Sequence, residues 1–447
     1  MRNLLNRYEL DLTIGKNLID RAPGDIQANR ALSRPLAPQR FVMETREPSN
    51  RLEALPLHGV DPHVELVDDV AGRGCQILPC SPSRFVFILL DIGRWLTLPR
   101  VTRLQKEIDE LAEATAFCGV VRVDRGDELV LEKAYGMAHR GLQVPNTVDT
   151  QFGLASAVKG MTAIAVVSLI VDGALDLSTP ARAVLGSDLP LIADDVTIEH
   201  LLAQRSGIGD YLDEDTGYEI SDYMMPISVH RLATTEQFLP VLDGHPTKFP
   251  AGQQFSYCNG GFMVLALIAE RVSGVQFHDL VDQRVCRPAG MVDTAFLRSD
   301  DLPGRTALGY LDVDGVVRTN VFHIPVRGNG DGGIYSTAAD ITALWRAFFA
   351  GKLVPVEWVA EMTRPRSVIS DDERYGLGFW LEGANKGAGE GVRLEGYDAG
   401  VSFRSWHFPT TRLTHTVISN TSDTPGNVWP LTKLLYERLS TDAEAGS

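Results

Sequence analysis

The alternation of apolar and polar residues changes character near residue 100. Before that position prolines and arginines are scattered and no clear periodicity is visible. From Val101 onward the pattern is regular, and Leu104, Ile108 and Leu111 recur at helical spacing with charged residues between them. We therefore predict a folded domain over 101–447. Residues 1–100 are interpreted as an N-terminal extension that is weakly structured or, if the true start codon lies downstream, not native sequence.

Strand-like runs stand at both ends of the predicted domain. Two β-rich runs around an Arg-Gly turn predict a hairpin over 117–138. Four more β-rich runs lie near the C-terminus, at 375–381, 391–397, 401–408 and 413–419. A last helix is predicted over 429–439.

Helical patterns fill the middle of the domain. Strongly apolar runs predict buried helices over 156–172 and 260–272, and another helix is expected over 337–350. Thr337 and Asp340 stand in the positions of a capping box at the start of that third helix. Helical patterns broken by Gly/Pro loops dominate the segment between the first and third of these helices.

This order of elements predicts the fold class α/β (α+β). One mixed, antiparallel sheet would be assembled from both ends of the domain and flanked by helices, with a helical subdomain inserted at roughly 180–330.

Composition and charge narrow the possible partners. The chain has 447 residues, of which 44% are hydrophobic and 22% charged, an ordinary globular mixture. Its formal net charge of −16 argues against nucleic acid or an anionic membrane as the main partner. The N-terminus has no uninterrupted apolar run, and no stretch is long enough to span a bilayer. We therefore expect a cytoplasmic protein without a membrane span.

The first candidate for chemistry is the pair Ser156 and Lys159. Residues three apart share a helix face, so the amine of Lys159 can lie beside the hydroxyl of Ser156. A serine is a weak nucleophile until a base removes its proton, and burial lowers the pKa of a lysine toward that task. Taken alone, the pair also fits an N-capping serine followed by a solvated lysine.

A second candidate is Tyr257-Cys258-Asn259, which directly precedes the helix predicted over 260–272. A phenol beside a lysine ammonium can lose its proton and act as a general base. The Asn259 amide can bond the lysine or a substrate carbonyl. A half-buried tyrosine followed by a helix-capping asparagine is the structural alternative, and Cys258 is read as a small buried filler.

The third candidate is the segment 396–400, Gly-Tyr-Asp-Ala-Gly, which precedes the strand predicted over 401–408. Small residues beside a strand let a substrate backbone approach closely. A strand-edge N–H there could join the Ser156 N–H in an oxyanion hole. An ordinary turn between two strands would have the same sequence.

The order and spacing of these three motifs resemble the serine β-lactamase and penicillin-binding-protein superfamily. The tyrosine of the second motif resembles the class C β-lactamase-like branch, which includes esterases, D-aminopeptidases and D-Ala-D-Ala carboxypeptidases. The resemblance covers roughly Val101 to the C-terminus. Supporting runs are HLLAQRSGIGDY at 200–211, FPAGQQFSYCNGG at 249–261, GDGGIYSTAADITALW at 330–345 and YGLGFW at 375–380.

The resemblance implies a β-lactamase/transpeptidase-like fold and assigns three catalytic roles. Ser156 would be the acylated nucleophile and Lys159 its proton partner. Tyr257 would be the base that activates Ser156 and later the deacylating water.

The resemblance also implies substrate contacts. Asn259 would bind a substrate amide, and the N–H of Gly400 would be the second oxyanion donor, or that of Val401 if the register slips by one. Tyr397 and Asp398 would line the substrate-binding and oxyanion region.

One departure from the family's pattern bears on the substrate. The third motif usually starts with Lys or His, as in K-T-G or H-x-G, but Tyr397 takes that place here. A cation there would favour a carboxylate-bearing substrate, so efficient β-lactam hydrolysis is not expected unless Arg404, on the following strand, supplies the charge.

The sequence therefore predicts an enzyme, a serine hydrolase acting on small esters, amides or peptide-like substrates, with an esterase or amidase favoured. A β-lactamase, D-Ala-D-Ala carboxypeptidase or D-aminopeptidase, a transacylase, and a non-catalytic binding protein are the alternatives. The chain contains no H-E-x-x-H motif and no G-x-S-x-G elbow. We expect no metal and no cofactor, and the sequence leaves the oligomeric state open.

Overall fold

The central sheet is built from segments near both ends of the domain. The computed structural model describes residues 92–444 apart from 218, 383–390 and 425. Eight strands lie in the order β2-β1-β14-β13-β12-β11-β10-β9, and each neighbouring pair is antiparallel. Their bounds are Gly119–Arg125 (β1), Glu128–Tyr135 (β2), Ser367–Val368 (β9), Glu373–Tyr375 (β10), Trp380–Glu382 (β11), Gly391–Asp398 (β12), Val401–Phe408 (β13) and Leu413–Ser419 (β14). The expected antiparallel sheet assembled from both ends of the domain is confirmed, and three two-stranded sheets accompany it.

Two predicted boundaries were wrong. The run 375–381 is not one strand, because Gly378 has a φ of 86° and the chain turns between β10 and β11. The first helix, α2 (Ile92–Ala114), begins well before Val101. The rest of the predicted N-terminal extension lies outside the described residues.

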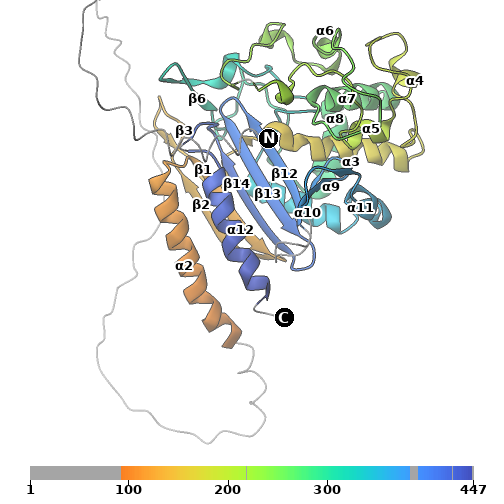
Figure 1. Ribbon diagram of the computed structural model, residues 1–447. Helices are drawn as coiled ribbons and strands as arrows, with labels where there is room; N and C mark the ends of the chain where they lie inside the picture. Colours follow the sequence, from red (N-terminus) through yellow and green to blue (C-terminus); the bar gives the residue numbers. More distant parts are fainter. Residues whose placement is uncertain (1–91, 218, 383–390, 425, 445–447) are drawn as a thin grey trace, which may run out of the picture. The chain divides into compact units, whose positions relative to one another are not determined.

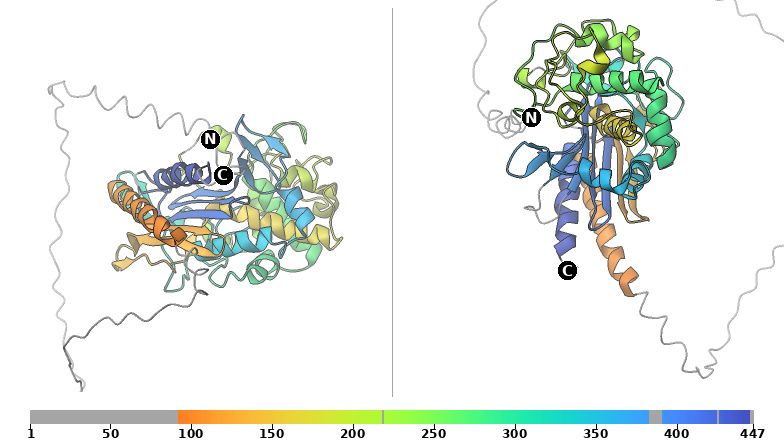
Figure 2. Two further views of the ribbon diagram at one scale, coloured as in Figure 1. Left: turned by 90° about the horizontal axis from the view of Figure 1, so that it is seen from below. Right: turned by 90° about the vertical axis from the view of Figure 1, so that its right-hand side faces the viewer.

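Helices cover both faces of the sheet, because the strands alternate apolar side chains between two cores. On one face α2 and α12 (Trp429–Glu444) lie side by side (Figures 1 and 2). There they bury Ile108 and Leu431 against Val121 and Val417 of the sheet. The opposite face carries α3 (Val158–Val171), α7 (Asn259–Ser273) and α10 (Ala338–Phe349) over the larger core.

The segment between α3 and α10 is mostly short helices and turns. It contains α4 (Arg182–Leu185), α5 (Ile198–Leu202), α6 (Leu239–Leu242), α8 (Phe277–Val281) and α9 (Arg287–Ala289). The hairpin of β6 (Tyr310–Val313) and β7 (Val316–Thr319) was not predicted. The remaining elements are β3 (Met137–His139), β4 (Val144–Pro145), β5 (Phe152–Gly153), β8 (Tyr335–Ser336) and α11 (Val356–Met362). Within the described ranges no single helix is long and apolar enough to cross a membrane, and only α7 with 277–289, a pair bent by 85°, passes on length and composition.

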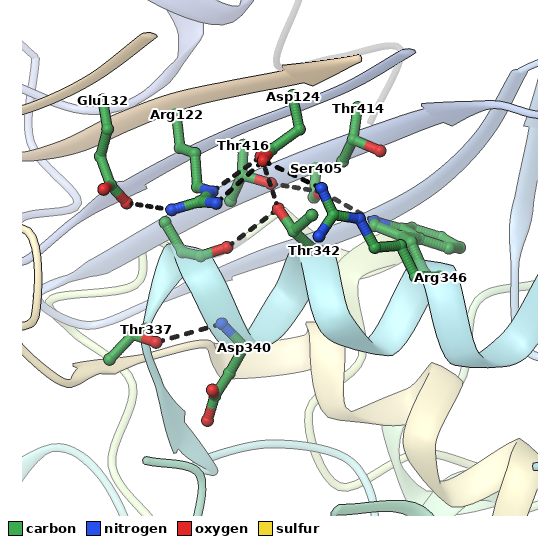
Figure 3. A network of polar contacts seen from close by, with 12 residues as sticks. Arg122, Asp124, Glu132, Thr337, Asp340, Thr342, Arg346, Ser405, Thr414 and Thr416 are labelled. Atoms are coloured by element: carbon green, nitrogen blue, oxygen red, sulfur yellow. Dashed lines mark hydrogen bonds and ion pairs between the residues drawn. The ribbon is translucent and has the colours of Figure 1, made fainter. Parts of the chain in front are cut away.

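A buried polar network holds α10 against the sheet (Figure 3). Asp124 of β1 is 1% exposed and accepts two hydrogen bonds from Arg122, at 2.7 and 2.8 Å. It also accepts one from Thr342 of α10 at 2.8 Å, and Arg346 lies 3.4 Å away. Glu132 on β2 pairs with the same arginine, Arg122, at 2.7 Å. The charges in this network are thus paired within the protein.

The predicted capping box of α10 is only half present. The Thr337 hydroxyl accepts the N–H of Asp340, as a capping residue should. The Asp340 carboxylate instead accepts hydrogen bonds from Asp293 N–H and from Thr294. Asp340 therefore ties α10 to the loop that follows α9 instead of closing the cap.

Candidate active site

Ser156 lies on a 3₁₀ turn, Ala155–Ala157, that runs directly into α3. Ala155 has a φ of 47°, a left-handed conformation that an alanine seldom adopts. Such strain is kept where surrounding contacts hold it, and it is common beside functional groups. The turn leaves the Ser156 side chain partly exposed, while both of its neighbours on the turn are buried.

Lys159 is the buried partner of this serine. Its side chain is 2% exposed, and its Nζ lies 2.9 Å from Ser156 Oγ. The same nitrogen lies 2.8 Å from Asn259 Oδ1 and 2.6 Å from the Asp331 carbonyl oxygen. Burial lowers the pKa of Lys159, although the Asp331 carboxylate opposes that change. The predicted neighbours Ser156 and Lys159 are therefore brought together.

Asn259 is fixed by the start of α7. Its N–H and that of Gly260 donate to the Asp210 carboxylate, at 2.6 and 2.8 Å, and its own amide nitrogen donates to the Leu212 carbonyl at 3.0 Å. Burial raises the pKa of Asp210 to about 6, against the effect of those two N–H groups. The amide oxygen of Asn259 is thereby aimed at Lys159.

The carbonyl of Asp331 is held from the other side. The Asp331 carboxylate accepts a short hydrogen bond from the Tyr211 hydroxyl. Tyr223 in turn donates to the Tyr211 carbonyl at 2.8 Å. This chain of contacts fixes the loop that supplies the third partner of Lys159.

Tyr257 lies between the lysine and an aromatic wall. Lys159 Nζ is 5.0 Å from the centre of its ring, and Ser156 is among the groups that act on its hydroxyl. The ring stacks on Trp380 of β11, with centroids 5.8 Å apart and planes 19° apart. Burial raises the pKa of Tyr257 well above its usual value, and the Glu214 carboxylate adds to the rise. Both effects favour the protonated form of the phenol.

Cys258 is a buried capping residue, in line with its reading as a filler. The side chain is 3% exposed, and its Sγ accepts the Gly261 N–H at 3.3 Å at the start of α7. Burial raises its pKa well above the ordinary thiol value, so it is not a reactive thiolate.

The strand β12 approaches the serine turn at Gly396. A Cβ on this residue would lie 2.0 Å from the Leu154 carbonyl oxygen and 3.1 Å from Ala157 N, so only glycine fits. The glycine of the third motif is therefore Gly396. The first position of that motif is then Leu394, and the expectation that Tyr397 occupies it was wrong.

The register of the hairpin between β12 and β13 sets the direction of each N–H. Asp398 pairs with Val401 across a two-residue turn. The two residues of such a closing pair are hydrogen-bonded to each other. The N–H groups of Asp398, Gly396 and Leu394 therefore point at β13. Tyr397 falls between these, and its N–H points to the opposite edge. β11 pairs with β12 only over 391–393, so this edge at Tyr397 lies beyond the end of β11, beside the serine turn.

Neither predicted oxyanion donor has the required direction. The N–H of Gly400 donates to Ser422 Oγ at 3.0 Å. The N–H of Val401 points at β12 as part of the closing pair. Both expectations were wrong for the same reason, because the turn between β12 and β13 lies three to four residues beyond Gly396.

The side chains of Tyr397 and Arg404 lie on the opposite face of the sheet. The Tyr397 ring is 6.2 Å from that of Trp429 on α12. The Arg404 guanidinium lies 4.4 Å above the same tryptophan and pairs with Glu395 at 2.7 Å. Arg404 therefore does not supply a positive charge to the site.

Asp398, in contrast, shares its face with Gly396. The side chain is half-buried, and its Oδ1 accepts the Ala399 N–H at 2.7 Å. Burial raises the pKa of Asp398 to about 7. Its carboxyl group therefore lies on the same side of β12 as the serine turn.

Several supporting residues were missed from the sequence. Asp210 and Tyr211 end the run HLLAQRSGIGDY, and Asp331 stands in GDGGIYS. Both runs support the family resemblance, but the sequence assigns no role to these three residues. Trp380 ends YGLGFW, another run that supports the resemblance without assigning a role to the tryptophan. Their function depends on contacts between distant segments, which one sequence does not reveal.

Comparisons with known proteins agree on one family. Residues 104–434 match the family model "Beta-lactamase". The chain is 29% identical over 315 residues to "Esterase EstB" of Burkholderia gladioli, covering 62% of this chain and 77% of that protein. It is 27% identical over 283 residues to "Putative penicillin-binding protein PbpX" of Bacillus subtilis (strain 168), covering 63% of this chain and 66% of that one.

A solved structure gives the same result. The penicillin-binding protein of Bacillus halodurans is 34% identical and superposes with a TM-score of 0.69, covering 73% of this chain and 99% of that one. Across these three proteins the matched part of this chain is similar in extent, so the similarity lies in the domain that carries the site.

Proposed function

The chain belongs to the beta-lactamase family, and from that premise we propose that it is a serine hydrolase that takes the acyl group of its substrate onto Ser156. The observation that carries this proposal is the distance of 2.9 Å between Ser156 Oγ and the buried Nζ of Lys159. A nucleophile with a base in hydrogen-bond reach, itself held by further groups, is the arrangement that covalent acyl transfer requires.

Lys159 acts as the base in this proposal. A neutral amine has two hydrogens and one lone pair. Asn259 Oδ1 and the Asp331 carbonyl can only accept, so they take the two hydrogens and leave the lone pair for the Ser156 hydroxyl. The pKa of Lys159, lowered by burial, supports the neutral form. Lys159 takes the serine proton as Ser156 Oγ bonds to the acyl carbon.

Tyr257 acts as the proton donor to the leaving group. Its raised pKa supports the neutral phenol, and the ring centre lies 5.0 Å from Lys159 Nζ, the partner of Ser156. When the tetrahedral intermediate collapses, Tyr257 gives its proton to the leaving oxygen or nitrogen and regains one from Lys159. In deacylation a water molecule loses a proton to the same relay, its oxygen bonds to the acyl carbon, and Ser156 Oγ is reprotonated.

The oxyanion of each intermediate would bind to two backbone N–H groups, those of Ser156 and Tyr397. The register of β12 supports the second choice, because the N–H of Tyr397 points to the edge beside the serine turn. Donors fixed by backbone geometry stabilise developing charge without rearrangement.

The proposed substrates are small esters or amides. Leu394 provides no charge at the first position of the third motif, and it is buried against α3. A β-lactam carboxylate would lack a charge-assisted donor there, which is worth about tenfold to a hundredfold in specificity.

The test compares kcat/KM for p-nitrophenyl butyrate and for benzylpenicillin on the purified chain. We expect the ester to be preferred by at least about tenfold. Turnover of neither compound, or a preference for the penicillin, would contradict the proposed substrate class.

A further inference from the structure

Trp380 stands at the edge of the proposed site, where β11 ends beside β12. It is the first residue of β11, and its partner Arg393 is the last residue of β12 that β11 covers. Beyond this pair the edge of β12 runs on to Gly396, which abuts the serine turn. Trp380 therefore borders the free edge of β12 at the site, although its own side chain is buried.

A row of cross-strand partners holds the indole of Trp380. Residues directly opposite each other on neighbouring strands share a face of the sheet and pack together. The Tyr375 ring, on β10, meets the indole edge-on, with centroids 5.1 Å apart and planes 88° apart. On the other neighbour, β12, the guanidinium of Arg393 lies over the indole, 5.2 Å from the ring centre. The indole is thus fixed by the strand on each side of it.

Arg393 is itself held firmly. Its guanidinium also lies 4.8 Å from the centre of the Trp406 ring, its partner on β13. It pairs with Glu395 at 3.0 Å and donates a short hydrogen bond to Glu373. The side chain is 7% exposed, so its cation–π contact with Trp380 lies away from solvent, where such contacts are strongest. This surrounding set leaves the indole little freedom to rotate.

Tyr257, in contrast, comes from a segment without regular secondary structure, residues 255–258. Its two neighbours in the chain are anchored to Gln204. The Ser256 N–H donates to the Gln204 carbonyl at 3.0 Å, and the Cys258 N–H donates to the Gln204 side-chain oxygen at 2.9 Å. These bonds place the backbone of Tyr257 but do not determine how its ring is turned.

The aromatic partner of the Tyr257 ring is Trp380. The two planes are only 19° apart and the centroids are 5.8 Å apart, which is a stacked arrangement. Rotation of the phenol about its side-chain bonds would break this stack. It would also move the ring from its place 5.0 Å from Lys159 Nζ. The stack therefore links the orientation of the phenol to the rigid row across the sheet.

We propose that Trp380 is a positioning residue, whose indole holds the Tyr257 ring in the orientation in which its hydroxyl reaches the leaving group. This inference rests on the proposed function, in which Tyr257 gives a proton to the leaving oxygen or nitrogen. Trp380 gives and takes no proton itself. Its effect follows from geometry, because a proton donor must lie within hydrogen-bond reach of the atom that it protonates.

Two esters of the same acid separate this role from a general effect on the site. p-Nitrophenyl butyrate releases a weakly basic phenolate that leaves without a proton, whereas ethyl butyrate releases an alkoxide that needs one. Both give the same butyryl-enzyme, and kcat/KM reports the steps up to its formation. The quantity measured is the ratio of kcat/KM for the ethyl ester to that for the p-nitrophenyl ester. The amount of folded enzyme cancels in this ratio.

The ratio should fall when the stack is lost. We expect Trp380→Leu to lower it at least about tenfold, a part of the 10²- to 10⁴-fold that a general acid contributes. Trp380→Phe keeps a flat ring and should restore the ratio to within about threefold of the wild type. Trp380→Met carries the same expectation as the leucine variant if that protein cannot be purified. Trp358→Leu, on α11 at the border of the larger core, is the matched control and should leave the ratio unchanged.

A double variant tests whether Trp380 acts through Tyr257. Tyr257→Phe alone should lower the ratio about a hundredfold or more, because the donor hydroxyl is gone. When Trp380→Leu is added to Tyr257→Phe, we expect no further fall, since the ring that Trp380 positions no longer carries a proton. A further tenfold fall in the double variant would show that Trp380 acts independently of Tyr257 and would overturn the proposal.

The remaining outcomes separate this inference from the proposed function. A ratio that falls in Tyr257→Phe but not in Trp380→Leu would overturn the role of Trp380 and leave the hydrolase intact. Equal losses on both esters in Trp380→Leu would do the same. A ratio that Tyr257→Phe leaves unchanged would contradict the proton-donor step, and the inference with it. Hydrolysis of neither ester by the wild type would contradict the hydrolase itself.

Discussion

Two clusters of buried ionisable groups lie on the same face of the sheet, and they differ in the kind of partner that contacts them. Around Asp124, two carboxylates and two arginines from β1, β2 and α10 pair with one another (Figure 3). Around Lys159, the amine contacts a hydroxyl, an amide oxygen and a carbonyl, and no carboxylate is among these three partners.

The difference separates a structural role from a chemical one. Opposite charges that pair inside the protein keep both groups ionised and fix the elements that carry them. An amine buried without a direct counter-ion has a lowered pKa, so its neutral form, which can accept a proton, is more populated than in an exposed lysine. The comparison predicts that substitutions in the first cluster change stability and that those in the second change activity.

The largest effect is expected for Lys159→Met. The substitution removes the amine and keeps an unbranched apolar chain of similar length, so kcat on p-nitrophenyl butyrate should fall about 10²- to 10⁴-fold. Stability should not fall, because an amine without a counter-ion is costly to bury. Activity assays and thermal unfolding test both statements, with Lys352→Met on the exposed surface as the control. A variant within tenfold of the wild-type rate would remove Lys159 from the mechanism.

The reverse pattern is expected for Asp124→Ala. The substitution removes a buried carboxylate that contacts both Arg122 and Arg346. Breaking these buried ion pairs should reduce the free energy of unfolding by about 3–5 kcal/mol. The rate per folded molecule should stay the same. Urea unfolding measures the loss, and Asp127→Ala, an exposed position, should cost less than about 0.5 kcal/mol. Equal effects of the two substitutions would show that the network does not stabilise the fold.

A smaller effect, about tenfold per pH unit, is expected on the acid side of the pH profile. Only neutral Lys159 can accept the serine proton, so kcat/KM should rise with pH below its pKa and level off above it. Because burial lowers that pKa below its ordinary value of 10.5, the plateau should begin well before pH 10.5. In Lys159→Met the rise should disappear. A wild-type profile that climbs steadily to pH 10.5 would mean that Lys159 is charged at neutral pH.

The sequence predicts contacts between residues that are close along the chain, but not contacts between distant segments. Ser156 and Lys159 are three residues apart on one local turn, so their contact follows from helix geometry. The contact between Lys159 and the Asp331 carbonyl joins segments 172 residues apart, and the bond between Thr342 and Asp124 joins segments 218 apart. No local pattern encodes such pairings, which depend on how the chain packs.

The third motif shows a second limit. Gly400, with a φ of 70°, serves a turn, whereas Gly396 serves the close approach of β12 to Leu154. Both glycines look alike in the sequence, where the family resemblance favours Gly400 as the oxyanion donor. Only the register of the hairpin distinguishes them, and it moves the proposed oxyanion donor to Tyr397.

The central claim is that Ser156 carries the acyl group and that Lys159 enables its attack by removing the serine proton. The most direct measurement is labelling with a fluorophosphonate, followed by mass spectrometry of the digested protein to locate the adduct. We predict an adduct on Ser156 in the wild type, none in Ser156→Ala, and labelling slowed at least about a hundredfold in Lys159→Met. An adduct on another residue, or labelling that persists in Ser156→Ala, would contradict this account.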